Sequence, residues 1–165
     1  MSISRRPAAS VIAASLLVTL LVAACSVPST PTPTPYGGAG GVIVEVAGAH
    51  LQAALADTSE TRAQGLSGLA SIPENAAMWF DLGTGREAAF WMKDMRFALD
   101  IVWVDEGLRV VGVSTGVPVP TPDVGDDALP TYSPGVPVRY VLEVNAGVAA
   151  ARGIVPGVLV RITPR

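Results

Sequence analysis

Residues 89–105 read AFWMKDMRFALDIVWVD, and this stretch decides the fold that the sequence predicts. It holds two of the three tryptophans and two of the three phenylalanines of the chain, interleaved with five charged residues. Such mixing is typical of half-buried strands. The second half, Asp100–Asp105, is followed by Glu106-Gly107 and then by the β-branched run 108–113. The pattern therefore predicts a β-hairpin whose tight turn ends in glycine.

The alternation within this stretch assigns neighbouring side chains to different faces of a strand. Phe90 and Met92 fall on one face, and Trp91 and Lys93 fall on the other. A single core cannot bury all four. One interpretation is that Trp91 and Lys93 belong to a binding surface. The other is that the aromatic residues are core residues and that Lys93 forms a structural ion pair with Asp100.

Short elements are also expected on both sides of this stretch. Further strands are expected at 42–46, 50–56, 77–82, 88–93, 138–144 and 158–163. A helix is expected over 57–66, with a capping box formed by Asp57 and Glu60, and a second runs from an Asn145 cap to Arg152, where Gly153 ends it. These elements predict a mostly β fold, either a compact antiparallel β-barrel or a jelly-roll-like sandwich with two short helices.

The segment from 116 to 137 carries six prolines and three aspartates without periodicity. A long irregular stretch in a compact domain is often a binding loop. Asp123, Asp126 and Asp127 could hold calcium, but they lack the alternating ligand spacing of an EF-hand loop, so an acidic solvated loop is the preferred interpretation. With one Cys and one His in the chain, we predict no metal site and no cofactor.

The N-terminus is predicted to be an export signal. Arg5 and Arg6 precede an apolar run over 11–24 that is too short to span a bilayer stably. The run ends in Val22-Ala-Ala-Cys25, which matches the bacterial lipobox. We therefore expect residues 1–25 to be a lipoprotein signal peptide and Cys25 to carry diacylglycerol. Ser26 rather than Asp follows Cys25. The resemblance to bacterial lipoproteins therefore implies that the protein is sorted to the outer membrane in a diderm host, or stays on the outer face of the plasma membrane in a monoderm host.

Residues 26–41 are rich in Thr, Pro and Gly, which predicts an extended tether without a core of its own. Residues 42–165 are then expected to form a single β-rich domain. The chain of 165 residues has a formal charge of −3 and a pI near 5.0, with its basic residues scattered. This charge distribution predicts no basic patch of the kind that binds nucleic acid, so the membrane and envelope components are the expected partners.

The first functional hypothesis is a binding module. Trp91 offers a stacking face, and Lys93, Arg62, Glu60 and Asp100 offer polar groups if the first helix packs over that strand. Sugars or cell-envelope polymers suit such a cleft. An accessory lipoprotein that docks another envelope protein, through the 116–137 loop or a sheet edge, is a further hypothesis.

An enzyme is the alternative, and carboxylates are the best chemistry that the chain offers it. Asp94, Asp100 and Glu143 could supply the acid and base of a glycan hydrolase if two of them converge. His50 has no Ser or Cys partner in a recognisable frame, which argues against a hydrolase triad. We therefore assign no catalytic residue from the sequence.

Five motifs resemble the prokaryotic family known as domain of unknown function 192. In chain order they are ETRAQGL over 60–66, FWMK over 90–93, LDI over 99–101, YS over 132–133 and YVLEVNAG over 140–147. The resemblance covers about Val42 to Thr163 and implies a compact, mostly antiparallel β-domain, often exported, with no agreed activity. Two departures stand out, because the family's Gly-Met-Leu-Phe is Ala-Met-Trp-Phe at 77–80 and its Asn-Thr is Asp-Met at 94–95.

Overall fold

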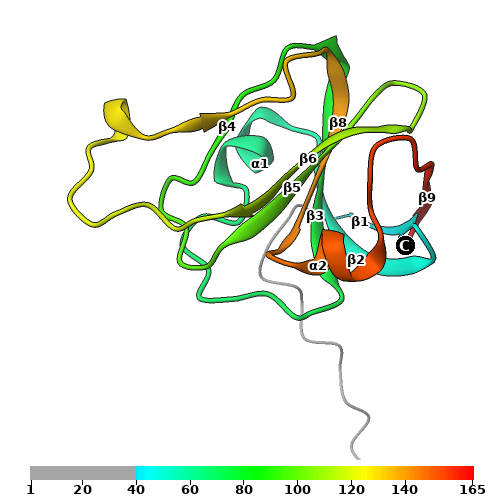
Figure 1. Cartoon of the computed structure of the whole chain (residues 1–165), viewed down its shortest axis with the longest axis horizontal. Coiled ribbons are helices and arrows are strands. Elements are labelled where there is room, and N and C mark those ends of the chain that lie inside the picture. Colours follow the sequence, from blue (N-terminus) through cyan, green and yellow to red (C-terminus); the bar gives the residue numbers. More distant parts are fainter. Residues whose placement is uncertain (1–39) are drawn as a thin grey trace, which may run out of the picture. The chain divides into compact units, whose positions relative to one another are not determined.

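The computed structural model describes residues 40–165, which form a mostly β domain with two short α-helices (Figure 1). Cys25, the signal peptide and most of the predicted tether lie outside the described residues. The elements are β1 (Gly41–Val46), β2 (Ala49–Ala56), α1 (Ser59–Gln64), β3 (Ala76–Arg86), β4 (Phe90–Trp91), β5 (Leu99–Val104), β6 (Val110–Val117), the 3₁₀ turn η1 (Asp126–Ala128), β7 (Thr131–Tyr132), β8 (Val138–Asn145), α2 (Val148–Arg152) and β9 (Val160–Pro164). No helix in this part of the chain is long and apolar enough to cross a membrane.

Seven strands form one sheet in the order β6-β5-β8-β3-β2-β1-β9, and β4 pairs with β7 in a separate ribbon. All pairings are antiparallel except β2 with β3, because α1 and its flanking loops carry the chain across between them. The sheet is not closed into a barrel, which corrects the barrel alternative. Its edge strands meet only near their starts, through a bridge between Arg109 and Leu159, so no ladder joins β6 to β9. A sandwich-like, β-rich fold fits the structure.

The hairpin predicted from the central stretch is confirmed, although its turn is longer than expected. β5 and β6 pair antiparallel, and residues 105–109 connect them. The Asp105 carboxylate accepts a hydrogen bond from the backbone N–H of Arg109 at 2.8 Å. Leu108, rather than Gly107, takes the left-handed conformation, with φ of 59°. The side chain of Asp105 therefore stabilises a turn that its glycine alone would not specify.

The sheet separates two hydrophobic cores. The first contains Met78, Phe80 and Ile101 and is covered by the residues around α1 and by the β4–β7 ribbon. The second contains Trp79 and Leu142 and is covered by β1, β9 and α2. Because successive residues of a strand point to opposite faces, the central strands β3, β5 and β8 are apolar on both sides. Two acidic residues on the central strands, Asp100 on β5 and Glu143 on β8, are buried between these layers.

Both predicted helices are present but begin later than expected. Thr58, not Asp57, caps α1, and its hydroxyl exchanges the capping-box bonds with Thr61. α2 begins after Gly147, whose φ is 89°, and Gly153 ends it in the left-handed conformation as predicted. The segment expected to be irregular contains the end of β6, η1 and β7, and it extends from the body of the domain (yellow in Figure 1).

Candidate functional site

A cavity of about 230 Å³ lies against the first core, where residues of α1, β3, β4 and β8 come together. Glu143 is its buried polar group, and the apolar side chains of Leu66, Phe80, Phe90 and Met95 form much of its wall. The volume is below the 300–1,000 Å³ that is usual for drug-sized ligands, so one small chemical group fits it.

Glu143 lies on β8 among apolar neighbours. In the sheet register it stands between Met78 on β3 and Ile101 on β5, both fully buried. The side chain is itself only 5% exposed. Burial raises the pKa of Glu143 to about 8, because a charged carboxylate is poorly solvated there. At neutral pH the carboxyl group is therefore mostly protonated in the empty cavity.

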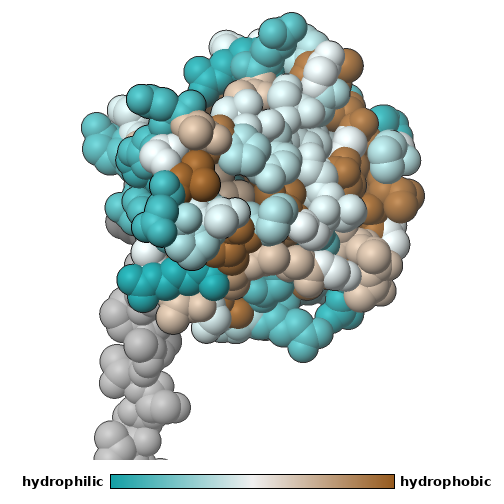
Figure 2. All heavy atoms as spheres, turned by 60° about the vertical axis from the view of Figure 1, so that its left-hand side comes forward, coloured by the Kyte–Doolittle hydropathy of each residue, from teal (hydrophilic) through white to brown (hydrophobic). Residues whose placement is uncertain are grey.

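The aromatic wall of the cavity is held rigidly. The Phe90 ring packs edge-on against Phe80, with centroids 5.0 Å apart, and against Trp103 at 5.6 Å. Trp91 follows on β4, lines the same cavity and keeps 49% of its surface exposed. Figure 2, which brings the left side of Figure 1 forward, shows hydrophobic patches set between hydrophilic side chains. Trp91 is thus an aromatic surface available to a ligand.

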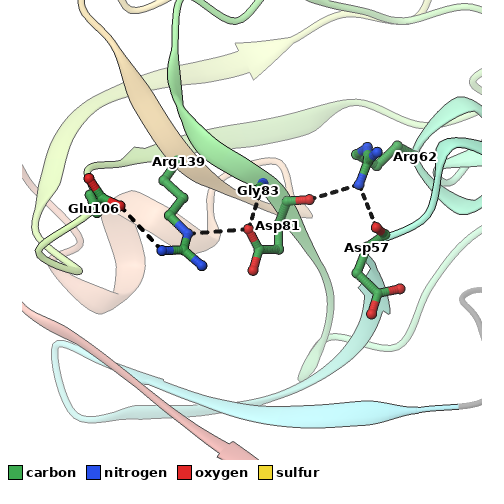
Figure 3. A network of polar contacts seen from close by, with 6 residues as sticks. All are labelled: Asp57, Arg62, Asp81, Gly83, Glu106 and Arg139. Carbon is green, nitrogen blue, oxygen red and sulfur yellow. Dashed lines mark hydrogen bonds and ion pairs between the residues drawn. The ribbon is translucent and has the colours of Figure 1, made fainter.

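Arg62 is one of the cavity-lining residues. Its side chain attaches α1 to β3 (Figure 3). Its Nη1 donates to the backbone oxygens of Asp57 at 2.6 Å and of Asp81 at 3.0 Å. The Asp81 carboxylate accepts from the Gly83 N–H at 2.8 Å and from Arg139 Nε at 3.4 Å. These bonds hold the backbone that Arg62 contacts. The remaining guanidinium donors of Arg62 form no hydrogen bond with any residue in 40–165 and can reach a ligand.

Lys93 lies beside Trp91 rather than in the cavity wall. Its ammonium pairs with the carboxylate of Asp126 on η1 and lies 5.6 Å from the Trp91 ring centroid. The hydrogen bond to Asp126 raises the pKa of Lys93. The backbone oxygen of Lys93 accepts a 2.8 Å bond from the Ser67 hydroxyl. Lys93 therefore connects the cavity's aromatic strand to the projecting loop, and its ion pair is with Asp126, not with Asp100.

The structure brings two of the five predicted ligand-binding residues into one cavity. Arg62 and Trp91 line it, and Lys93 is adjacent to Trp91. Glu60 lies exposed in the first turn of α1 and does not line the cavity. Asp100 lies on the opposite side of the sheet, fully buried, where its carboxylate accepts from the backbone N–H groups of Gly116 and Ala149.

The carboxylates considered for hydrolysis do not gather at the cavity. Glu143 pairs with Ile101 and Asp100 with Val144, so the two carboxyl groups point to opposite faces. Asp94 lines a neighbouring hollow with Arg96 and Gly68. Among the cavity-lining residues, Glu143 is the only acid. In the described part of the chain, no three His, Cys, Asp or Glu side chains group as metal ligands would.

Glu143 is the functional candidate that the sequence analysis weighed only as one member of a hydrolase pair. The strand pattern gave no signal for its burial, because Arg139, Val141 and Glu143 share one face of the strand 138–144 and the other face is apolar. Such alternation is typical of a strand with one face in solvent. Glu143 is buried because residues around α1 and β4 also cover that second face.

Comparison with known families and structures shows which family the domain belongs to and which solved proteins share its fold. The family model of DUF192, an uncharacterized ACR, matches residues 42–162. This chain belongs to that family. Comparison with curated proteins gives no match. Among solved structures, the chain is similar to a protein of unknown function from Novosphingobium aromaticivorans, with 28% identity, 73% of this chain and 83% of that chain covered, and a TM-score of 0.64.

A second similar structure is a protein from Sinorhizobium meliloti that is described as a candidate transcription regulator. Its identity to this chain is 25%, with 77% of this chain and 95% of that chain covered and a TM-score of 0.65. Both similarities span the β-domain, so the DUF192 domain described here has the fold of two solved proteins. The family resemblance seen in the five sequence motifs is thereby confirmed.

Proposed function

We propose that this DUF192 domain is the ligand-binding module of a lipid-anchored cell-envelope protein, and that the cavity above Glu143 is its binding site. The observation that carries the proposal is a carboxyl group that is 5% exposed and faces an open cavity with a rigid aromatic wall. The Glu143 carboxyl lines this cavity, so its hydrogen-bonding groups are available to a ligand. The lipobox at Cys25 supports the envelope location.

The size and lining of the cavity favour a small ligand, or one end group of an envelope polymer, over a long polymer chain. A hydrolase would need a second carboxylate beside the first, and Glu143 has none among the cavity-lining residues. The regulator description of the Sinorhizobium meliloti protein is not carried over, because a net charge of −3 with scattered basic residues does not suit a nucleic-acid surface.

A titration with peptidoglycan fragments and short glycans tests this proposal. The full chain, purified in mild detergent, would be followed by tryptophan fluorescence and calorimetry. Trp79 and Trp103 are buried to 1% exposure, so Trp91 is the tryptophan that reports ligand contact. We expect saturable binding that Trp91→Ala weakens at least tenfold. Because Lys93 pairs with Asp126 outside the cavity, Lys93→Ala should weaken binding less.

A matched pair of variants locates the site. Ala63 lies exposed on α1 and lines the cavity, so Ala63→Phe should fill its entrance and abolish binding. Ala151 lies exposed on α2, and Ala151→Phe adds the same bulk on a helix that packs on the second core. Equal binding by both variants would place the site elsewhere. No binding by any probe, with the fold intact, would instead favour an accessory protein that docks through the 116–137 loop.

A further inference from the structure

The cavity has an acidic residue at its buried end and basic residues at its exposed end. Glu143 is at the buried end, and Arg62 and Arg86 line the more exposed side. Arg86 is exposed at the end of β3 and forms no ion pair with any residue in 40–165. Arg62 has donors beyond those that hold α1 to β3. The lining therefore offers one acid inside and two guanidinium groups outside.

Each end restricts what an occupant can be. A carboxylate enclosed by Phe80, Phe90 and Leu66 is stabilised by a cation that supplies the missing counter-charge. Aromatic faces such as Trp91 add attraction for an ammonium group. Exposed guanidinium groups favour a carboxylate and disfavour a simple cation. A ligand that satisfies both ends carries an amine at one end and a carboxylate at the other.

We propose that the cavity binds a small amino-acid-like zwitterion, with its protonated amine at Glu143 and its carboxylate at Arg62 and Arg86. A short apolar spacer between the two charges lies along the aromatic wall. This inference names the ligand class of the proposed binding function and rests on it. The cavity of about 230 Å³ accommodates an amino acid or one residue at the end of a peptide, not a longer chain.

Binding of the amine is coupled to release of a proton. Burial sets the pKa of Glu143 near 8 in the empty cavity, and an ammonium group can pair only with its deprotonated form. The other ionisable lining residues are Arg62 and Arg86, and His50 on β2 does not line the cavity. The proton lost by Glu143 passes to solvent, about 0.9 of a proton per ligand at pH 7.

Calorimetry on the full chain in mild detergent measures this release directly. The probes are linear ω-amino acids from 3-aminopropanoate to 6-aminohexanoate, titrated in buffers of different ionisation enthalpy. Alkylammonium ions and alkyl carboxylates of matched length are the comparison ligands. We expect one spacer length to bind at least tenfold more tightly than either single-charge analogue. Its affinity should rise about fifty-fold from pH 6 to pH 8, as a carboxyl pKa near 8 requires.

Two variants separate the ends of the ligand. Glu143→Gln should remove the proton release, and it should weaken binding of the zwitterion more than binding of the alkyl carboxylate. Arg86→Gln should weaken binding of the zwitterion and of the alkyl carboxylate but leave binding of the alkylammonium ion unchanged. Glu60→Gln and Arg96→Gln change the same residue types outside the cavity lining, and both should bind as the parent chain does. If Glu143→Gln fails to fold, the proton release measured with the parent chain and the ligand affinities of Arg86→Gln still test the inference.

Other outcomes overturn the inference. Equal binding of alkyl carboxylate and zwitterion without proton release would show that a protonated Glu143 meets an anionic or neutral ligand. Binding of envelope fragments that is blocked in Ala63→Phe, with no binding of any ω-amino acid, would leave the proposed function standing and remove the zwitterion. Failure of both probe sets would overturn the inference and the proposed function together.

Discussion

Asp100 and Glu143 are two buried carboxyl groups on adjacent strands, and their surroundings give them different roles. Asp100 accepts hydrogen bonds from Gly116 at 2.8 Å and from Ala149 at 2.9 Å. Those bonds fix the end of β6 and the start of α2 relative to β5, and without Asp100 the buried amide of Ala149 would lack a partner. Glu143 has burial as the sole cause of its pKa shift, with no bond to offset it. Asp100 is thus structural, whereas Glu143 is costly to the fold and free to meet a ligand.

The cost of Glu143 predicts how stability depends on pH. Its folded pKa of about 8 lies above the ordinary value of 4.5, so the folded state holds its proton more tightly than the unfolded state. The favourable contribution is complete below pH 4.5 and is lost as the pH rises through 8. Between pH 5 and pH 9 this group should lower the free energy of unfolding by about 4 kcal/mol.

Urea unfolding of the parent chain and of Glu143→Gln at several pH values measures that effect. The variant carries no titrating group at position 143, so the stability difference between the two chains should shift by about 4 kcal/mol in favour of the variant from pH 5 to pH 9. Glu60→Gln, at an exposed position, serves as the matched control and should follow the parent chain above pH 6. Parallel pH profiles for Glu143→Gln and the parent would contradict the burial of Glu143.

The same pair shows the limit of the sequence at the residue scale. Alternation along β5 and β8 predicts which residues share a face, but both faces of these strands are covered. Which face adjoins a cavity depends on α1 and β4, which are distant in the chain. Sequence patterns therefore placed Arg62 and Trp91 among the candidates through their motifs, included Asp100, and gave Glu143 only a secondary place.

At the scale of elements, α1 depends on Arg62 for its position. The helix has only six residues and buries none of them, so its own packing stabilises it little. Two hydrogen bonds from Arg62 Nη1 connect it to the backbone at Asp57 and Asp81. Replacing Arg62 with Lys keeps the charge but removes the Nη1 group that donates both bonds. We expect amide exchange in α1 to quicken about tenfold, with a loss of about 1 kcal/mol in unfolding free energy.

Hydrogen exchange followed by mass spectrometry compares Arg62→Lys with Arg96→Lys. Arg96 is exposed and makes no side-chain hydrogen bond within residues 40–165, so its replacement should leave exchange in α1 unchanged. Unchanged exchange in Arg62→Lys as well would show that the wall of the cavity does not need these bonds. A general loss of protection in β3 and β8 would instead mean that the whole first core depends on Arg62.

Elements with strong local signals were predictable, and elements set by distant contacts were not. The β5–β6 hairpin and the strand β8 follow from their apolar, β-branched patterns. The expected strand over 88–93 is reduced to Phe90–Trp91, because its pairing partner β7 is only two residues long. β7 itself lies in a proline-rich segment with no periodicity and forms only by pairing with β4. Tertiary pairing thus decides what propensity leaves open.

At the scale of the molecule, the domain is one open sheet with a hydrophobic core on each face, and the two cores have different roles. The second core, with α2, β1 and β9, holds the sheet together without lining the cavity. The first core carries the cavity, α1 and the ribbon of β4 and β7. Local sequence patterns predicted the strands, but they did not predict that the sheet stays open. Closure into a barrel would require the two edge strands, β6 and β9, to pair along their length, and they share only one bridge. Substitutions around the cavity therefore leave the second core, which holds the fold, unchanged.

The lipobox predicts where this domain works, and mass spectrometry of the full chain expressed in a bacterial host tests it. The mature chain should begin at Cys25 and carry diacylglycerol, because residues 22–25 match a lipobox. The acyl chains would then anchor the protein, since each buried methylene contributes about 0.8 kcal/mol to membrane binding. Cys25→Ala should yield a chain without lipid that keeps residues 1–24, since the Cys25 thiol is the acceptor of the lipid and cleavage at the Ala24–Cys25 peptide bond follows lipidation. Ser26→Ala changes the next residue and should still be lipidated. A parent chain cleaved elsewhere, with an unmodified Cys25, would remove the anchor and leave the cavity to act in a protein that is merely exported.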